Sequence, residues 1–163
     1  MKNFLITLII ILIPVKCFGL IEVDITRGNL NPLPVAVSPL SIDEESRKNF
    51  ENILKIKNIG SEISAIVENN LKISGLFNPL NKDAFLQEPD IANLKPRFED
   101  WNLIKAQALI TGKVSYVEEK LRVEFRLWDV LAGKEMMALA FTTVSSNWRR
   151  VGHIITDKVY ERL

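Results

Sequence analysis

The sequence is poor in the residues that most often carry metal and redox chemistry. Among 163 residues it has one cysteine, Cys17, and one histidine, His153. A single cysteine excludes an intramolecular disulfide, and a zinc site would need further histidine or cysteine ligands. The formal net charge of +1 supplies neither a polyanion-binding surface nor an acidic solvating tail. The phosphate-binding loop and the dinucleotide fingerprint are also missing.

Long apolar runs are scarce too, and the clearest one stands at the start of the chain. Residues Phe4 to Val15 are almost entirely apolar and follow the positive charge of Lys2. This run suits the core of a signal peptide, whereas a membrane-spanning helix needs roughly 20 residues. Cleavage after Gly19 would leave small residues, Gly19 and Cys17, at the positions that signal peptidase reads. We therefore expect residues 1–19 to be a cleavable secretory signal.

Two alternatives for this segment stay open. The run is an uncleaved anchor in the first, and Cys17 carries a lipid in the second, although Lys16 before it fits lipidation poorly. Cleavage would remove Cys17, so the exported chain would reach an oxidising compartment without a disulfide. It would also remove two lysines and bring the net charge slightly below zero.

The next segment, residues 20–32, is predicted to be an arm and a linker. Its apolar and polar residues alternate from Ile21 to Thr26, which is the period of a half-buried strand. Residues 27–34 carry glycine, asparagine and proline and are typical of a loop. The strand is thus separated from the rest of the chain, as an arm would be.

A domain is predicted over residues 33–163, and its first half mixes clear and unclear patterns. Residues 33–40 ("LPVAVSPL") indicate a buried central strand. Residues 41–58 are charged and predict either a solvated insertion or a short helix. A clearer helix is expected with Ser61 as its N-cap. It should end just before Gly75, which is expected to have a left-handed backbone conformation. Residues 82–95 are polar and irregular.

The second half of the domain begins with a helix after Pro96 and continues as strands. The inner side of that helix is predicted to carry Phe98, Trp101, Leu103 and Ile104. Three antiparallel strands should follow, linked at residues 118–120 and at Gly133. The middle strand alternates strictly, which predicts a core face made of Leu121, Val123, Phe125 and Leu127.

The chain closes with a helix that should start near Ser146. Its apolar residues recur every four positions, and they are Val151, Ile155, Val159 and Leu163. Helices packed on a mixed sheet give a two-layer α/β or α+β sandwich, which is the fold class that we predict. The sequence shows no internal repeat.

His153 and Asp157 are the most obvious candidates for catalysis. On an α-helix His153 lies about 200° from Val151, so both members of the pair should face solvent. An exposed pair of this kind contributes less than about 1 kcal/mol. Serines are plentiful, but none stands in the nucleophile elbow GxSxG. Three interpretations of this pair stay open: it lies on a solvated helix face, it contacts a partner, or it serves a small exported hydrolase that uses His153 and Asp157.

The remaining charged clusters have less specific patterns. The acidic runs Asp43–Glu45 and Glu118–Glu119 fit charged turns, although spacing alone does not exclude a glycosidase-type carboxylate pair. Arg149 and Arg150 beside an aromatic residue suggest a nucleic-acid contact, which an exported, near-neutral domain rarely makes. Core or interface positions are expected for the tryptophans Trp101, Trp128 and Trp148.

Several segments in fixed order resemble one protein family. They are "LPVAVSPL", "LKISGLFNPLNKDAF", "FEDWNLIKAQALITGKV", "VEFRLWDVLAGKEM" and "WRRVGHIITDKVYERL". Together they resemble the amino-terminal part of the TolB family, the periplasmic component of the Tol–Pal envelope system. The resemblance covers the whole expected mature chain. It implies an α/β domain similar to the anticodon-binding domains of some aminoacyl-tRNA synthetases.

The resemblance also carries expectations about organisation and function. In the family a six-bladed β-propeller follows this domain. This chain ends at Leu163 and is therefore expected to be an N-terminal fragment or a truncated product. The family role is that of a non-enzymatic periplasmic adaptor, with no cofactor or metal and no nucleic acid. It links the inner-membrane protein TolA to the outer-membrane lipoprotein Pal, and it supports outer-membrane invagination during division and envelope integrity.

The propeller supplies most of the Pal surface in the family, and the extreme N-terminal arm binds TolA. An alternating strand is suited to addition at the edge of a partner's sheet. Carried over by position, the TolA-binding residues would be Leu20, Ile21, Glu22, Val23, Asp24, Ile25, Thr26 and Arg27.

Overall fold

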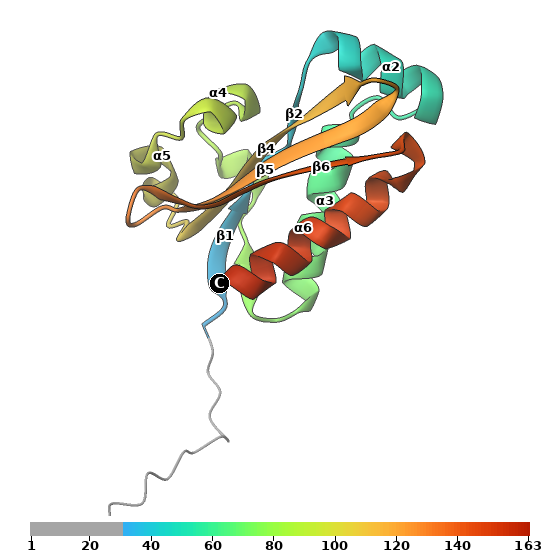
Figure 1. Cartoon of the computed structure of the whole chain (residues 1–163). Coiled ribbons are helices and arrows are strands. Elements are labelled where there is room, and N and C mark those ends of the chain that lie inside the picture. Colours follow the sequence, from blue (N-terminus) through green and yellow to red (C-terminus); the bar gives the residue numbers. More distant parts are fainter. Residues whose placement is uncertain (1–30) are drawn as a thin grey trace, which may run out of the picture.

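The computed structural model describes residues 31–163 (Figure 1). The expected signal peptide (1–19) and the expected arm (20–27) lie outside the described residues. The described part of the chain forms one mixed sheet with helices on both of its faces.

The sheet has six strands, and its main path runs in the order β3-β1-β4-β5-β6. Strand β1 lies between β3 and β4 and is parallel to both, while β2 pairs with the later part of β4. Strands β4, β5 and β6 form the antiparallel meander that the sequence predicted. The bounds are β1 Leu33–Val37, β2 Ser41–Ile42, β3 Phe77–Pro79, β4 Ala108–Val117, β5 Lys120–Asp129 and β6 Lys134–Thr143.

The three longer helices cover one face of this sheet, and two short helices cover one end of the other face (Figure 1). This arrangement confirms the predicted α+β class, a mixed sheet with helices packed on it. The two short helices add a partial third layer to the two layers that the sequence predicted. The helices on the first face are α2 (Glu44–Leu54), α3 (Ile59–Ile73) and α6 (Trp148–Arg162). The remaining helical elements are η2 (Lys82–Ala84), α4 (Pro89–Leu94), α5 (Phe98–Leu103) and η3 (Ser145–Asn147).

The larger core lies between the sheet and α2, α3 and α6. Strand β5 contributes the four alternating residues predicted for it, because Leu121, Val123, Phe125 and Leu127 are each fully buried. Helix α6 contributes Val151, Ile155 and Val159, which are also buried. Leu163, which shares their period, is 44% exposed because it follows the last turn of the helix.

Helices α3 and α6 cross closely, and a glycine allows the approach. A Cβ added to Gly152 would lie 2.9 Å from Cγ2 of Ile66 on α3. Helix α3 is capped by Asn58, whose Oδ1 accepts from the Ser61 backbone N–H at 3.1 Å, so the predicted N-cap Ser61 was wrong. Its end agrees with the prediction, because Gly75 has a left-handed φ of 72°.

Residues 41–58 belong to the domain and are not a solvated insertion. They form β2 and α2, in agreement with the short-helix interpretation. Phe50 is fully buried and meets the Tyr116 ring edge-on at 5.3 Å. The buried Ser46 hydroxyl accepts from the Tyr116 backbone N–H at 2.8 Å. One fully buried aromatic side chain and one buried hydroxyl therefore hold this charged helix on the sheet.

The smaller core on the other face corrects two further expectations. Residues 82–95, expected to be irregular, contain η2 and α4, and α4 buries Ala92. Trp101 of α5 is buried as predicted, but Leu103 is 74% exposed. The reason is geometrical: two residues advance about 200° around a helix, so Leu103 faces away from the core that Trp101 enters.

Candidate interaction surfaces

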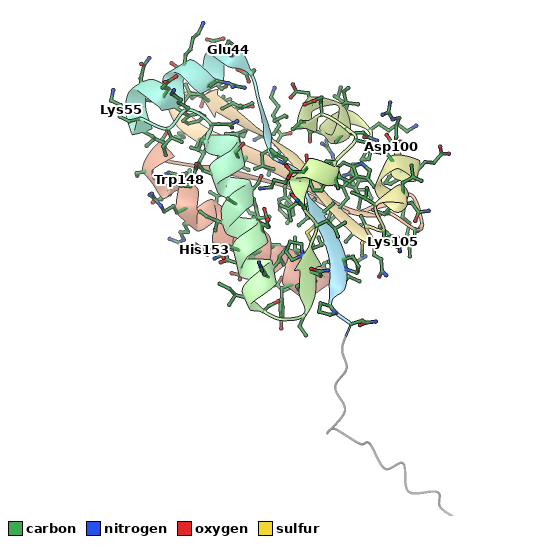
Figure 2. The ribbon with its side chains drawn as sticks, turned by 180° about the vertical axis from the view of Figure 1, so that it is seen from behind. Glu44, Lys55, Asp100, Lys105, Trp148 and His153 are labelled. Carbon is green, nitrogen blue, oxygen red and sulfur yellow. The ribbon has the colours of Figure 1, made fainter. Side chains whose placement is uncertain are left out.

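His153 lies on the exposed side of α6 and contacts α3. Figure 2 labels His153 on α6. Its Nδ1 is 2.8 Å from the side-chain nitrogen of Asn70, which also donates to the Thr156 hydroxyl at 3.3 Å. In this arrangement the Asn70 amide donates and Nδ1 accepts. The prediction that His153 points away from the sheet is confirmed. Within residues 31–163 no ion pair joins it to Asp157.

The surroundings of His153 do not favour catalysis. Its hydrogen-bond partner is an amide rather than a serine hydroxyl, so no nucleophile is activated there. In the described part of the chain, no three histidine, cysteine, aspartate or glutamate side chains gather into a metal-binding group. The structure therefore gives no support to a hydrolase built on His153 and Asp157.

The two acidic runs lie at a helix N-terminus and in a tight turn, where they have structural roles. Asp43 is the N-cap of α2, and its carboxylate accepts from the Ser46 backbone N–H at 2.8 Å. This hydrogen bond is the main reason that the pKa of Asp43 is lowered, and the Lys113 ammonium at 3.6 Å lowers it further. Glu118 and Glu119 both have positive φ values, 48° and 61°, and form the tight turn between β4 and β5.

A carboxylate on α5 fixes a loop in the same way. The pKa of Asp100 is lowered by hydrogen bonds from the Gln87 amide at 3.0 Å and from the Arg97 guanidinium at 2.8 Å. Gln87 is buried and also binds the backbone of Arg97 in both directions. These contacts tie the segment before α4 to the start of α5.

The tryptophans belong mainly to the core, as predicted. Trp101 and Trp148 are buried. Trp128 is half-buried on the sheet and donates from Nε1 to the Thr111 hydroxyl at 2.9 Å. The Arg149 guanidinium lies 4.2 Å from the centre of the Trp148 ring, so Arg149 and Arg150 point to different surroundings.

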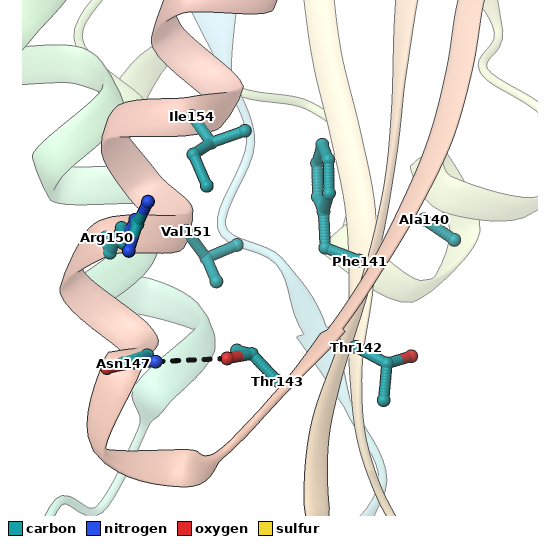
Figure 3. Close-up of a pocket in the computed structure, with 8 residues that line it drawn as sticks. All are labelled: Ala140, Phe141, Thr142, Thr143, Asn147, Arg150, Val151 and Ile154. Atoms are coloured by element: carbon teal, nitrogen blue, oxygen red, sulfur yellow. Dashed lines mark hydrogen bonds between the residues drawn. The ribbon is translucent and has the colours of Figure 1, made fainter.

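A groove of about 370 Å³ lies between α6 and strand β6 (Figure 3). Phe141 of β6 faces Val151 and Ile154 of α6 across it, and a hydrogen bond of 3.2 Å from Asn147 to Thr143 closes one end. Arg150 is the charged residue among those that line the groove. Sequence reasoning missed this surface, because it arises where an exposed strand edge lies beside a helix.

The described chain enters the domain close to the end of α6. Strand β1 begins at Leu33, which is in register with Phe77 of β3. Phe77 in turn meets the ring of Tyr160, in the last turn of α6, at 6.0 Å. Figure 1 shows β1 beginning beside the C-terminal end of α6. Within residues 31–163, no helix combines the length and the apolar composition that crossing a membrane requires. The eight predicted arm residues lie outside the described residues.

Fold and surface together define a small α+β domain with a mixed sheet and one long open sheet edge. Residues 21–136 match the family described as the TolB amino-terminal domain, and the chain belongs to this family. This agrees with the resemblance that the sequence segments indicated.

A curated relative gives the same answer. The chain is 81% identical over 156 residues to the Tol-Pal system protein TolB of Pelagibacter ubique (strain HTCC1062). The aligned part is 96% of this chain and 35% of that protein, so the chain spans about a third of the relative's length.

Solved structures show where else this fold occurs. TolB from Acinetobacter baumannii has a TM-score of 0.62 at 19% identity, covering 80% of this chain and 28% of that one. A PelC dodecamer from Paraburkholderia phytofirmans has a TM-score of 0.51 at 16% identity, covering 77% of this chain and 87% of that one. At these identities the likeness concerns the fold alone.

Proposed function

We propose that this chain is the amino-terminal part of a non-enzymatic periplasmic adaptor of the Tol–Pal system. The adaptor links a TolA-like inner-membrane protein to a Pal-like outer-membrane lipoprotein. It thereby supports outer-membrane invagination during division and the integrity of the envelope. Family membership and the 81% identity to a Tol-Pal system protein support this role.

The observation that carries the proposal is the alternating segment Leu20–Arg27, separated from β1 by a short linker rich in asparagine and proline. Alternation gives a strand one apolar side and one polar side, and such a strand can extend the edge of a partner's sheet. We assign the contact with the TolA-like partner to this arm. The contact with the Pal-like partner is assigned mainly to the part of the longer relatives that this chain does not span.

The test is to delete Leu20–Thr26 from the mature chain and to measure binding to a purified TolA-like protein by calorimetry. Binding should be lost while the melting temperature changes little, because the deletion leaves every residue of the described domain in place. A matched variant exchanges Val23 and Asp24, which keeps the composition and breaks the alternation, and it should weaken binding. Unchanged affinity after the deletion would refute the assignment of this partner to the arm.

A further inference from the structure

Strand β6 presents an unusually open edge. It has ten residues, and within residues 31–163 it pairs with β5 alone. Residues 136–143 contain no charge, proline or glycine. Exposed edge strands are usually short, charged or interrupted by proline, because an open edge invites another strand. The opposite edge follows that rule: β3 has three residues and ends at Pro79.

Among residues 31–163, contacts with the outer edge of β6 are confined to its start. The Arg162 guanidinium of α6 donates to the Met136 carbonyl at 3.4 Å. A register shift in the pairing with β5 lies in the same region, at Leu127 and Trp128. From Met137 to Thr143 the described part of the chain leaves the edge unpaired, and this length can pair with about seven residues of an extended segment.

Both faces beside this edge have room for the side chains of an added strand. On the helix side lies the groove floored by Phe141, Val151 and Ile154 (Figure 3). On the other side the small residues Ala138 and Ala140 leave a shallow trough of about 190 Å³. A strand beside β6 would place alternate side chains in the groove and over the trough.

The charge of the groove selects among possible occupants. Arg150 lines it, and in the described part of the chain this arginine has no carboxylate partner. Ile154 lies one helical turn further along, about 6 Å away along the axis. Groove-facing residues of an added strand are about 6.8 Å apart. An acidic residue and an apolar residue two positions apart would therefore meet Arg150 and Ile154 together.

We propose that the edge of β6 from Met137 to Thr143 binds an extended segment of a partner protein by strand addition. The partner segment places an acidic side chain against Arg150 and an apolar side chain, two residues away, against Phe141 and Ile154. Backbone hydrogen bonds supply affinity, and these two positions supply selectivity. This surface is distinct from the arm of the proposed function.

Two other occupants fit the surface less well. A second copy of β6 has no acidic residue between 136 and 143 to meet Arg150. The chain's own arm has acidic residues, but its linker would have to cross four strand spacings of ~4.8 Å. The five linker residues, 28–32, reach at most about 18 Å when fully extended, which is shorter than these four spacings. The contact of Arg162 with Met136 also occupies the start of the β6 edge.

The test uses the mature chain and the synthetic peptide acetyl-TVTDTVT-amide, which presents the motif in either strand direction. Binding should slow hydrogen exchange at backbone amides of residues 137–143 by about tenfold or more, while β4 amides stay unchanged. Arg150→Glu should weaken peptide affinity about tenfold or more. The matched variant Arg149→Glu, whose side chain lies on Trp148 outside the groove, should keep affinity within about twofold.

A charge exchange completes the test. A peptide with lysine in place of aspartate should bind Arg150→Glu better than it binds the wild-type chain. Equal affinity of the two peptides for the wild-type chain, or no added protection along β6, would overturn the proposal. The proposal would also be overturned if the β6 amides were already protected in the free chain and lost this protection when residues 20–26 were deleted. The same holds if their protection depended on protein concentration. Failure of the peptide to bind would leave the binding of the arm to its own partner unaffected, whereas the deletion outcome would assign the β6 edge to the arm.

Discussion

The two sides of helix α6 are packed in opposite ways. On the side toward α3 there is no space, since a Cβ on Gly152 would meet Ile66 at 2.9 Å and Ile155 is 1% exposed. On the side toward β6 a groove of about 370 Å³ stays open between Ile154 and Phe141. One helix thus combines a tightly packed face and a face with unused apolar surface.

This difference separates stability from recognition. The contacts with α3 and β5 fix the position of α6, so Arg150 and Ile154 are held beside the groove without being part of the buried core. Their side chains can then vary with little effect on folding. Apolar surface left open on a rigid frame is typical of an interaction site.

The largest effect in this comparison should come from Ile155. Ile155→Ala leaves a cavity in the larger core and should lower the free energy of unfolding by about 2–5 kcal/mol. Ile154→Ala removes the same atoms from the half-buried groove side and should cost less than about 1 kcal/mol, because those atoms already meet solvent. Urea unfolding measures both. Equal losses would show that the two sides of α6 are packed alike.

A smaller effect is expected from Gly152→Val. The new side chain would overlap Ile66, and overpacking of this kind costs about 1–3 kcal/mol. Asp157→Val is the control, because it introduces the same branched residue at an exposed position of the same helix. Thermal unfolding of the pair separates crowding from helix propensity. If both variants lose the same stability, the close approach of α3 and α6 is not what requires glycine.

The smallest effect concerns the third helix on the same face, α2. Asp43→Ala removes its N-cap and should cost about 1 kcal/mol, whereas Asp43→Asn keeps a capping oxygen and should cost less. The two variants therefore distinguish the hydrogen bond from the charge.

The same residue predicts a pH dependence. The pKa of Asp43 is lower in the folded chain than its ordinary value of 3.8. Its stabilising contribution is therefore complete above this value and is lost as the pH falls through the folded pKa. Urea unfolding at several acidic pH values should show the wild-type chain losing more stability than Asp43→Asn. Parallel losses would mean that the Asp43 carboxylate does not stabilise α2.

Regular periodicity made part of the fold predictable. The strict alternation from Leu121 to Leu127 and the four-residue spacing from Val151 to Val159 each identified a buried face correctly. Gly75 marked the end of α3, because its left-handed conformation suits glycine. These features are local, so a short window of sequence contains the information.

Features that depend on distant contacts were not predictable in the same way. Helix α2 has a single large buried residue, Phe50, and that residue is buried because Tyr116 of β4 lies across it. The cap of α3 was placed at Ser61, since Asn58 and Ser61 are both good capping residues and only the backbone decides between them. The groove beside β6 combines residues from a strand and a helix, and no single segment carries its signature.

The parallel pairing of β1 with β4 has a consequence for the order in which the chain folds. It joins Val35 to Ala108, so residues 36–107 must close into a loop before this contact can form. The meander from β4 to β6 pairs neighbours in sequence and closes only short turns. Contacts of low sequence separation form fastest. During synthesis β1 is made before β4, so the apolar residues of β1 cannot be buried against β4 until β4 has been synthesised.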